Sequence, residues 1–217
     1  MKLAVKFHQF FMPKTKSLLD GIGNENVTEK YYDDWAINYD QTLKKWNYKA
    51  PKKAVKILGK VKIKFDNILD LACGTGMFAE EIKKKYKKII IDGCDISTQS
   101  LKIAKQKKLY RKLHKKSFEK KIKITNKYDL ISMIGSMTYC QKPNILFSLV
   151  NAYLKKNGIF IFSHRIDLWE KQNFDALLEK FKKNFTIKYR SRPLKYLPEN
   201  TDFSNKIKIR IIVLKKI

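Results

Sequence analysis

The sequence has no long apolar run. No stretch approaches the roughly 18 consecutive apolar residues that a membrane-spanning helix needs. The opening segment MKLAVKFHQFF is broken by Lys6, His8 and Gln9 before a run of signal-peptide length develops. We therefore expect a soluble, cytoplasmic protein with no membrane partner. Its 217 residues, 44% apolar, can bury one large core.

Cysteine is also scarce. Cys73, Cys94 and Cys140 form no CxxC pair and show no metal-ligand spacing. Isolated thiols of this kind suit a reducing compartment, where disulfides are rare. The sequence therefore predicts three free thiols and no metal site.

Acidic residues and arginine are few, whereas lysine is abundant. The chain has 48 Lys and Arg against 20 Asp and Glu, a net charge of +28, and only five of the 48 are Arg. A basic face can bind nucleic acid by neutralising phosphates. However, phosphate-binding sites favour Arg, and the lysines are spread from Lys2 to Lys216. A solvated Lys-rich surface is the favoured interpretation, and a nucleic-acid partner is the less favoured one.

Strand patterns alternate with helix patterns along the chain, which is typical of a doubly wound α/β fold. We expect a single-domain, Rossmann-like, seven-stranded and mostly parallel sheet whose last strand is antiparallel. The expected domain covers 28–217, with a helical N-terminal lid over 28–60, after an extension over 1–27. Strands are predicted at 67–72, 88–96, 112–118, 127–135, 159–165, 186–192 and 206–216. Helices are predicted at 27–46, 50–61, 77–86, 98–110, 144–158 and 167–185.

A glycine-rich loop follows the first predicted strand, in the segment NILDLACGTGMFAEEI. Gly74 and Gly76 followed by Ala79 match a G-x-G-x-x-A dinucleotide fingerprint, and both glycines allow close approach of a ligand to the backbone. Asp95 lies 19 residues after Gly76, at the end of the next strand, where a carboxylate can accept both ribose hydroxyls. A nicotinamide or flavin enzyme therefore remains one interpretation.

Asp70 favours a different ligand. It lies at the end of the first strand, facing the glycine loop, where an anionic pyrophosphate would meet a fixed negative charge. A ligand with a cationic amino-acid end would be stabilised there. S-adenosylmethionine carries an ammonium, a sulfonium and a ribose but no phosphate, so the pair Asp70 and Asp95 suits it better.

Several motifs together resemble the Class I S-adenosylmethionine-dependent methyltransferases. LDLACGTG resembles the first motif of that family, with Ala72 where Gly is commoner, and GCDIS followed by Leu101 and Ala104 resembles the second. YDLISMIGSMTY resembles the fourth motif, and LKKNGIFIFS the turn and strand after it. YYDDWAINYD and LYRKLH look most like small-molecule methyltransferases of broad bacterial type.

The resemblance implies a site for S-adenosylmethionine, with S-adenosylhomocysteine as product. Asp70 would act near the methionine end, Asp95 would hold the ribose and Ile96 would pack on the adenine. Ser117 and Phe118 stand where the family often has an acid, so adenine recognition would depend on backbone groups or the Ser117 hydroxyl. The implied cofactor-binding residues are Tyr31, Tyr32, Tyr39, Asp70, Ala72, Cys73, Gly74, Gly76, Asp95, Ile96, Ser117, Phe118, Ile134 and Ser136.

The aromatic residues of the first predicted helix have two interpretations. Tyr31, Tyr32, Trp35 and Tyr39 share one face, and such a stripe can simply cover the edge of the sheet as core. The resemblance instead implies that Tyr39, and either Tyr31 or Tyr32, close over the cofactor. An aromatic lid suits a sulfonium, which is attracted to ring faces, and it excludes water.

Methyl transfer needs a base only if the acceptor carries a proton at the working pH. Two candidates follow predicted strands: His164, after IFIFS, and Tyr139, after IGSMT. Open α/β sheets bind ligands at such strand ends, so His164 is expected to face the acceptor. Arg165, Arg190 and Arg192 are alternative ligands for a carboxylate or phosphate of the acceptor, although a solvated cation is the favoured interpretation of each. The expected function is methyl transfer to a small-molecule acceptor; the alternatives are an RNA or protein methyltransferase and a non-catalytic cofactor-binding protein.

Overall fold

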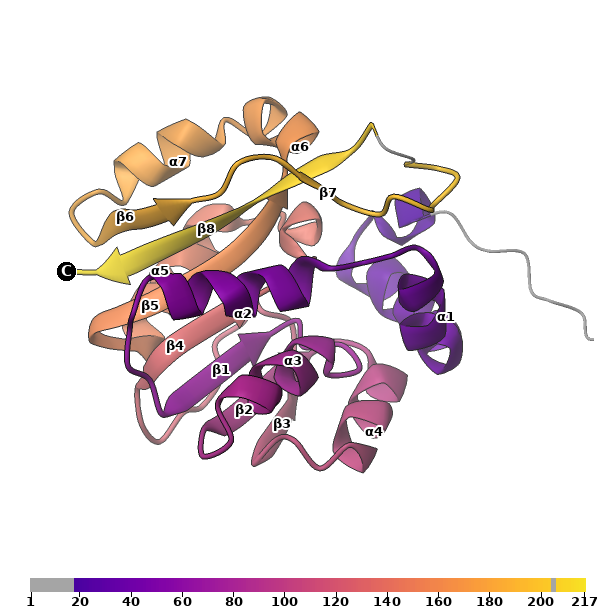
Figure 1. Ribbon diagram of the computed structural model, residues 1–217, viewed down its shortest axis with the longest axis horizontal. Helices are drawn as coiled ribbons and strands as arrows, with labels where there is room; N and C mark the ends of the chain where they lie inside the picture. The colour runs from indigo at the N-terminus through magenta and orange to yellow at the C-terminus, as the bar shows by residue number, and fades with distance from the viewer. Residues whose placement is uncertain (1–17, 204–205) are drawn as a thin grey trace, which may run out of the picture.

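A central sheet with helices on both faces forms the protein (Figure 1). The computed structural model describes residues 18–203 and 206–217. The strands are β1 (Asn67–Leu71), β2 (Ile90–Asp95), β3 (Lys112–Lys115), β4 (Tyr128–Met133), β5 (Leu154–Arg165), β6 (Phe185–Arg190), β7 (Leu194–Lys195) and β8 (Lys208–Lys216). The helices are α1 (Glu25–Lys45), α2 (Ala50–Lys60), α3 (Met77–Lys85), α4 (Thr98–Gln106), α5 (Pro143–Tyr153), α6 (Ile166–Lys171) and α7 (Phe174–Lys180), with 3₁₀ turns η1 (Leu18–Gly21) and η2 (Met137–Tyr139).

The topology confirms the predicted fold class. The order is β3-β2-β1-β4-β5-β8-β6, and β7 pairs with β8. Strands β1 to β5 run parallel, whereas β8 is antiparallel to both β5 and β6. All seven predicted strands are present, and β7 is a two-residue addition inside a predicted loop. The order reverses between β1 and β4, which is where sheets of this kind bind ligands.

Two apolar cores lie on opposite faces of the sheet, and β5 contributes to both. Ile159 and Ile161 pack toward α2 and α3, whereas Phe160 and Phe162 pack toward α5, α6 and α7. This division follows from the alternation of side chains along a strand. Because both faces are covered, β5 is apolar at nearly every position.

Two predicted helices were wrong in extent. The helix predicted at 144–158 ends at Tyr153, because Leu154 already pairs with Tyr128 in β4. The helix predicted at 167–185 is divided into α6 and α7 at Asn173, whose φ of 45° is left-handed and interrupts the helix. Trp169 and Phe174 lie on either side of that break and are both buried. Their apolar spacing therefore resembles that of one continuous helix.

The predicted lid, 28–60, corresponds to two helices with different positions. α1 begins after Asn24, whose side chain accepts a hydrogen bond from the Val27 amide at 3.1 Å. Figure 1 shows α1 beside the loop that joins β7 to β8, whereas α2 lies across the sheet. Most of the predicted extension, 1–27, falls outside the described residues. None of the described helices is long and apolar enough to cross a membrane.

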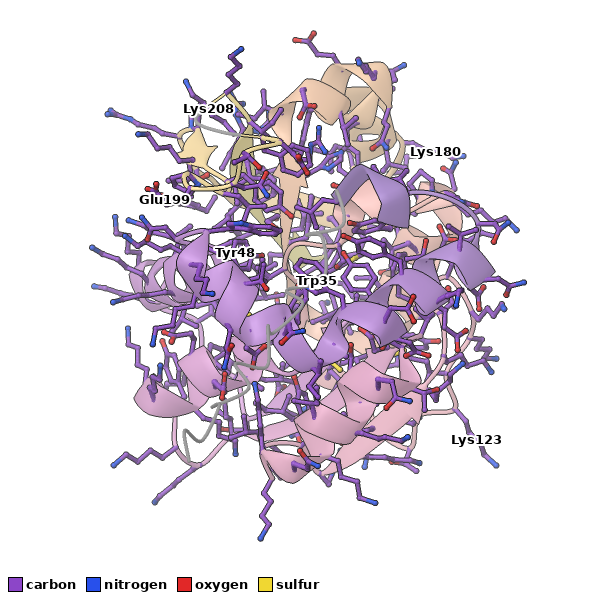
Figure 2. All side chains as sticks on the ribbon, turned by 90° about the vertical axis from the view of Figure 1, so that its right-hand side faces the viewer. Trp35, Tyr48, Lys123, Lys180, Glu199 and Lys208 are labelled. Atoms are coloured by element: carbon purple, nitrogen blue, oxygen red, sulfur yellow. The ribbon has the colours of Figure 1, made fainter. Side chains whose placement is uncertain are left out.

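A third apolar cluster joins α1 to the segment 196–207. Leu43 on α1 packs there with Leu197 and Phe203, and Trp35 and Tyr196 lie against them. Figure 2 shows Trp35 near the middle of this side of the molecule. Segments from the two ends of the chain thus form a single cap beside the carboxyl ends of the strands.

Candidate functional site

The glycine loop between β1 and α3 requires left-handed backbone at three positions. Ala72, Gly74 and Gly76 have φ values of 50°, 53° and 95°. Only glycine adopts such values without strain, so Ala72 carries a small conformational cost. Gly76 also lies against Tyr110, since a Cβ atom there would be 3.2 Å from the tyrosine ring. The loop brings its backbone to the switch point between β1 and β4.

Asp95 connects the end of β2 to this loop. Its carboxylate accepts hydrogen bonds from the backbone amides of Gly74 and Ser97, each at 2.8 Å. Burial raises the pKa of Asp95 to about 6, although these two hydrogen bonds oppose the rise, and the nearby charge of Asp33 adds to it. Binding of positive charge or hydroxyl donors would favour the ionised form.

Asp70 is the second buried acid, and it is only 1% exposed. The hydroxyls of Ser132 and Tyr110 donate to its two oxygens at 2.7 and 2.8 Å. Burial raises the pKa of Asp70 to about 7; the two hydrogen bonds lower it, and Asp95 raises it further. Two acids that repel each other in a buried site favour a cationic ligand.

Two small cavities lie over these acids. One, of about 60 Å³, has Asp95 and Ile96 in its wall, and the other, of about 30 Å³, has Asp70 and Cys73. The sequence-predicted residues that line one or both are Tyr32, Tyr39, Asp70, Ala72, Cys73, Gly74, Asp95, Ile96, Phe118, Ile134, Ser136 and Tyr139. Most of the predicted site is therefore brought together, with residues from four strand ends and from α1.

Three predicted cofactor residues lie beside these cavities rather than in their walls. Tyr31 is buried and packs edge-on against Tyr32 and Trp35, so Tyr32 and Tyr39 are the tyrosines of α1 that reach the cavity. Ser117 lines a neighbouring hollow of about 110 Å³. Gly76 forms the cap of α3 behind the loop.

Polar contacts hold α1 over the site, and the sequence reasoning missed their residues. Asp33 accepts hydrogen bonds from the Ser97 hydroxyl at 2.7 Å and the Gln99 amide at 2.9 Å. Asp40 accepts from the Thr75 hydroxyl and the Lys107 ammonium, both at 2.5 Å. Asp33 and Asp40 are seven residues apart, two helical turns, so they lie on one face of α1. Two acids seven residues apart, next to the aromatic stripe of the same helix, were the sequence pattern from which these contacts could have been predicted.

The cavities are smaller than a nucleoside-sized ligand requires. Ligand sites in proteins usually hold about 300 Å³ or more, whereas the main cavity holds about 60 Å³. Tyr32 and Tyr39 of α1 form part of its wall. The neighbouring hollow of about 110 Å³ shares Ile96, Phe118 and Tyr139 with this cavity and adjoins it.

His164 does not face this site, and the expectation that it meets the acceptor is wrong. It is 1% exposed and lies on the opposite face of β5, with its ring 4.7 Å from the Phe174 ring and 5.8 Å from the Trp169 ring, centroid to centroid. Among the described residues neither ring nitrogen has a hydrogen-bond partner. Burial lowers the pKa of His164 to about 4, although the nearby side chain of Gln172 opposes the shift. The reason is strand parity, because His164 shares its face with Phe160 and Phe162.

Tyr139 does reach the cavity. It ends η2 and accepts a hydrogen bond from the Tyr32 hydroxyl at 2.8 Å. Together with Tyr39, Tyr48 and Tyr196 these two residues form what we call the tyrosine cluster. Burial raises the pKa of every member, and neighbouring phenols raise the pKa values of Tyr32, Tyr39 and Tyr48 further. The phenols are therefore neutral hydrogen-bonding groups at pH 7.

The described part of the chain has no cluster of side chains that could bind a metal ion. Residues 18–203 and 206–217 contain no group of three or more His, Cys, Asp or Glu that could hold an ion. All three cysteines are buried and unpaired, and burial raises the pKa of Cys73 well above that of a free thiol. Cys73 is therefore a neutral thiol in the wall of the smaller cavity.

A larger cleft, of about 390 Å³, lies between the start of α2 and β7. Lys49, Lys53 and Lys195 line it together with Glu199. It contains none of the predicted site residues. Lysine side chains extend from the whole outline of the molecule in Figure 2, so their presence here does not distinguish this cleft.

A family model described as "Methyltransferase domain" matches residues 69–160. Malonyl-[acyl-carrier protein] O-methyltransferase 2 of Ilyobacter polytropus is 34% identical over 99 residues, which are 45% of this chain and 38% of that protein. The corresponding O-methyltransferase of Halalkalibacterium halodurans is 30% identical over 104 residues, or 44% and 38% of the two chains. This chain thus aligns with less than half the length of either relative.

Solved structures resemble the whole fold. An S-adenosylmethionine-dependent methyltransferase from Clostridium acetobutylicum aligns with a TM-score of 0.58 and 19% identity over 88% of this chain and 99% of that one. The plantazolicin methyltransferase BpumL, solved with S-adenosylhomocysteine, aligns with a TM-score of 0.59 and 15% identity over 87% and 88%. At these identities the likeness concerns the fold alone.

Proposed function

We propose that this chain is a class I methyltransferase that transfers a methyl group from S-adenosylmethionine to a small-molecule acceptor. The match of residues 69–160 to the methyltransferase-domain model and the partial likeness to curated O-methyltransferases support the proposal. The observation that carries the proposal is the pair of buried acids, Asp70 and Asp95, on either side of the glycine loop. Their mutual repulsion suits a ligand with a cationic end and a ribose, and disfavours a pyrophosphate. The names of the curated relatives, both O-methyltransferases, support the reaction class.

Each part of the site has a role in this proposal. The oxygens of Asp95 accept hydrogen bonds from ribose hydroxyls, Asp70 stabilises the ammonium end, and Ile96 with Phe118 covers the adenine. Tyr32 and Tyr39 of α1 exclude water from the reacting centre. When bound, the cofactor supplies a methyl group that positive sulfur already activates. The chain therefore has mainly to align the acceptor.

Acceptors that need no deprotonation fit this site best. The phenols of the tyrosine cluster are neutral, and His164 lies on the other face of the sheet. The buried acids Asp70 and Asp95 are assigned to the cofactor. An acceptor atom with a free lone pair at pH 7 can attack without a general base. The RNA or protein methyltransferase and the non-catalytic alternative lack comparable support, because the curated relatives are named O-methyltransferases and the lysines are spread along the whole sequence.

Asp95→Ala tests the cofactor assignment. We expect S-adenosylhomocysteine binding to weaken by about 1.5–3 kcal/mol for each charge-assisted hydrogen bond lost, as measured by isothermal titration calorimetry. Asp66→Asn is the matched control, because Asp66 is an exposed acid just before β1, at the opposite edge of the sheet. The control should bind with wild-type affinity. Tight NADH binding with no response to S-adenosylhomocysteine would refute the proposed function.

Tyr139→Phe tests whether this phenol acts as a base. Because burial holds the Tyr139 hydroxyl neutral, we propose that it orients the acceptor through a hydrogen bond. Removing one neutral hydrogen bond costs about 1 kcal/mol, so kcat/KM should fall roughly fivefold to tenfold. A loss on the order of 10² to 10⁴ would instead assign Tyr139 as general base. Steady-state kinetics with labelled cofactor on the identified acceptor separates the two results.

A further inference from the structure

Arg165 is the last residue of β5, at the carboxyl end of that strand. It is 8% exposed and shares its strand face with Ser163. The Ser163 hydroxyl accepts a hydrogen bond from the Gly135 amide at 2.8 Å, and Gly135 lines the main cavity. Arg165 is therefore a buried cation at the end of β5, and the neighbouring strand β4 leads to Gly135 in the cavity wall.

A row of aromatic rings leads from Arg165 toward the methionine end of the site. The guanidinium carbon is 4.7 Å from the centroid of Phe203, and Phe203 stacks on Tyr196 with 6.0 Å between centroids. Tyr196 meets Tyr48 edge-on at 5.8 Å. Tyr48 in turn lines the smaller cavity together with Asp70. Arg165 and the cofactor site are thus connected by one aromatic wall.

Some N–H groups of the Arg165 guanidinium have no acceptor among the described residues. Nε and Nη2 donate to the two oxygens of Asp167 at 3.1 and 2.6 Å, and within the described residues Nη1 has no acceptor. Only five of the 48 basic residues in the chain are arginines, so a buried arginine at this point is a departure from the general lysine usage. Burial raises the pKa of Tyr139 and Tyr196, and the positive charge of Arg165 opposes both shifts. Its field therefore reaches the phenols of the tyrosine cluster.

We propose that Arg165 anchors a carboxylate of the methyl acceptor, with Phe203 and Tyr196 packed against the apolar part of that molecule. A guanidinium edge matches a carboxylate in geometry and charge. A phosphate dianion would bring two negative charges to a single guanidinium that Asp167 already neutralises in part. The substrate class is then a small carboxylate that also carries apolar surface. This inference rests on the proposed function, since it assigns the acceptor side of the same site.

Benzoate is the probe, because it combines a carboxylate with one aromatic ring, and benzamide is its neutral counterpart. Binding to the full chain saturated with S-adenosylhomocysteine is measured by NMR titration. Wild type should bind benzoate saturably and more tightly than benzamide. Arg165→Gln should weaken benzoate binding by about tenfold or more and leave benzamide unchanged, because one charge-assisted pair is lost.

Asp167→Asn distinguishes an anchor from a structural ion pair. It removes the same internal pair but frees the whole guanidinium, so benzoate should bind at least as tightly as to wild type. Arg111→Gln is the matched control, because Arg111 forms a similar two-point pair with Asp92 next to β3, away from the site, at 3.0 and 2.5 Å. That control should retain wild-type benzoate affinity.

Three results would overturn the proposal: no saturable benzoate binding by wild type, equal affinity in Arg165→Gln, or equal losses in Arg165→Gln and Asp167→Asn. If thermal denaturation shows that Arg165→Gln is unfolded, Arg165→Lys takes its place, and it should bind benzoate several-fold more weakly than wild type because it lacks the planar fork; equal affinity there would also overturn the proposal. Affinity for S-adenosylhomocysteine is the separate readout. Failure of wild type to bind it refutes the proposed function instead.

Discussion

Phe147→Ala is expected to lower the free energy of unfolding by about 3–5 kcal/mol, a large share of the stability of a domain this size. Phe147 on α5 is fully buried and contacts the rings of five other phenylalanines. Phe181 is among the closest, at 5.3 Å between centroids. Truncation leaves a cavity that several rigid rings cannot refill. Urea denaturation followed by circular dichroism measures the loss.

Ile145→Ala is the control for this substitution. Ile145 lies on the same helix but is 43% exposed. Removing its side chain should change the free energy of unfolding by no more than about 1 kcal/mol. Similar losses in the two variants would contradict the packing described for α5.

His164→Met is expected to remove a contribution that lowers the free energy of unfolding of wild type by about 3 kcal/mol at pH 4 relative to pH 7. The buried acids Asp70 and Asp95, whose pKa values are raised, act in the opposite direction in both proteins and cancel when the two are compared. The folded protein holds the pKa of His164 at about 4 because the ring is buried, whereas the unfolded chain has a value of about 6.5. As pH falls below 6.5 the unfolded chain takes up the proton first, so stability declines until the folded pKa is reached. The difference corresponds to about 3 kcal/mol at pH 4. Above pH 6.5 this contribution to stability is fully present.

Urea denaturation at several values between pH 4 and pH 7 would measure this effect. The stability of wild type relative to His164→Met should fall by about 3 kcal/mol between pH 7 and pH 4, and the two curves should run parallel above pH 7. His114→Gln is the control, because His114 is only half-buried on the edge strand β3 and its replacement should leave most of the slope. Parallel acid slopes in wild type and His164→Met would show that the ring is not held neutral. Affinity for S-adenosylhomocysteine should stay within about threefold of wild type, since His164 is not in the site.

The fold class was predictable because strand and helix patterns alternate clearly. The strand predicted at 67–72 ends one residue later than β1, and the weak pattern at 112–118 contains β3. The loop between β1 and α3 contains Gly74 and Gly76, the glycines that its left-handed backbone requires. Where local pattern and fold agree in this way, the sequence alone is sufficient.

The wrong helix ends have a different cause. Nothing local distinguishes Leu154, the first residue of β5, from the apolar residues of α5 before it, because pairing with Tyr128 on a distant strand decides its conformation. Asn173 interrupts the 167–185 pattern with a left-handed residue, but an Asn also fits within a helix. Long-range contacts therefore decide both where α5 ends and where α6 is separated from α7.

Much of the candidate site could also be predicted, because strand ends meet at one edge of a parallel sheet. For His164, the prediction of which face of β5 its side chain occupies was wrong. The run IFIF is apolar on both faces of β5, so no alternation shows which side the next residue takes. Tyr196 and Phe203 were missed for another reason. They lie between β6 and β8, and only the insertion of β8 beside β5 brings that segment against α1.

The cap over the site joins residues that a ribosome makes at very different times. Leu43 on α1 emerges early, whereas Leu197 and Phe203, which complete the third apolar cluster, emerge only as the last strand approaches. At roughly 5–20 residues per second, α1 waits on the order of ten seconds for its partners. During that interval the aromatic face of α1 has no cover from this segment. Until the segment between β7 and β8 is synthesised, Leu43 and Trp35 lack this part of their apolar packing.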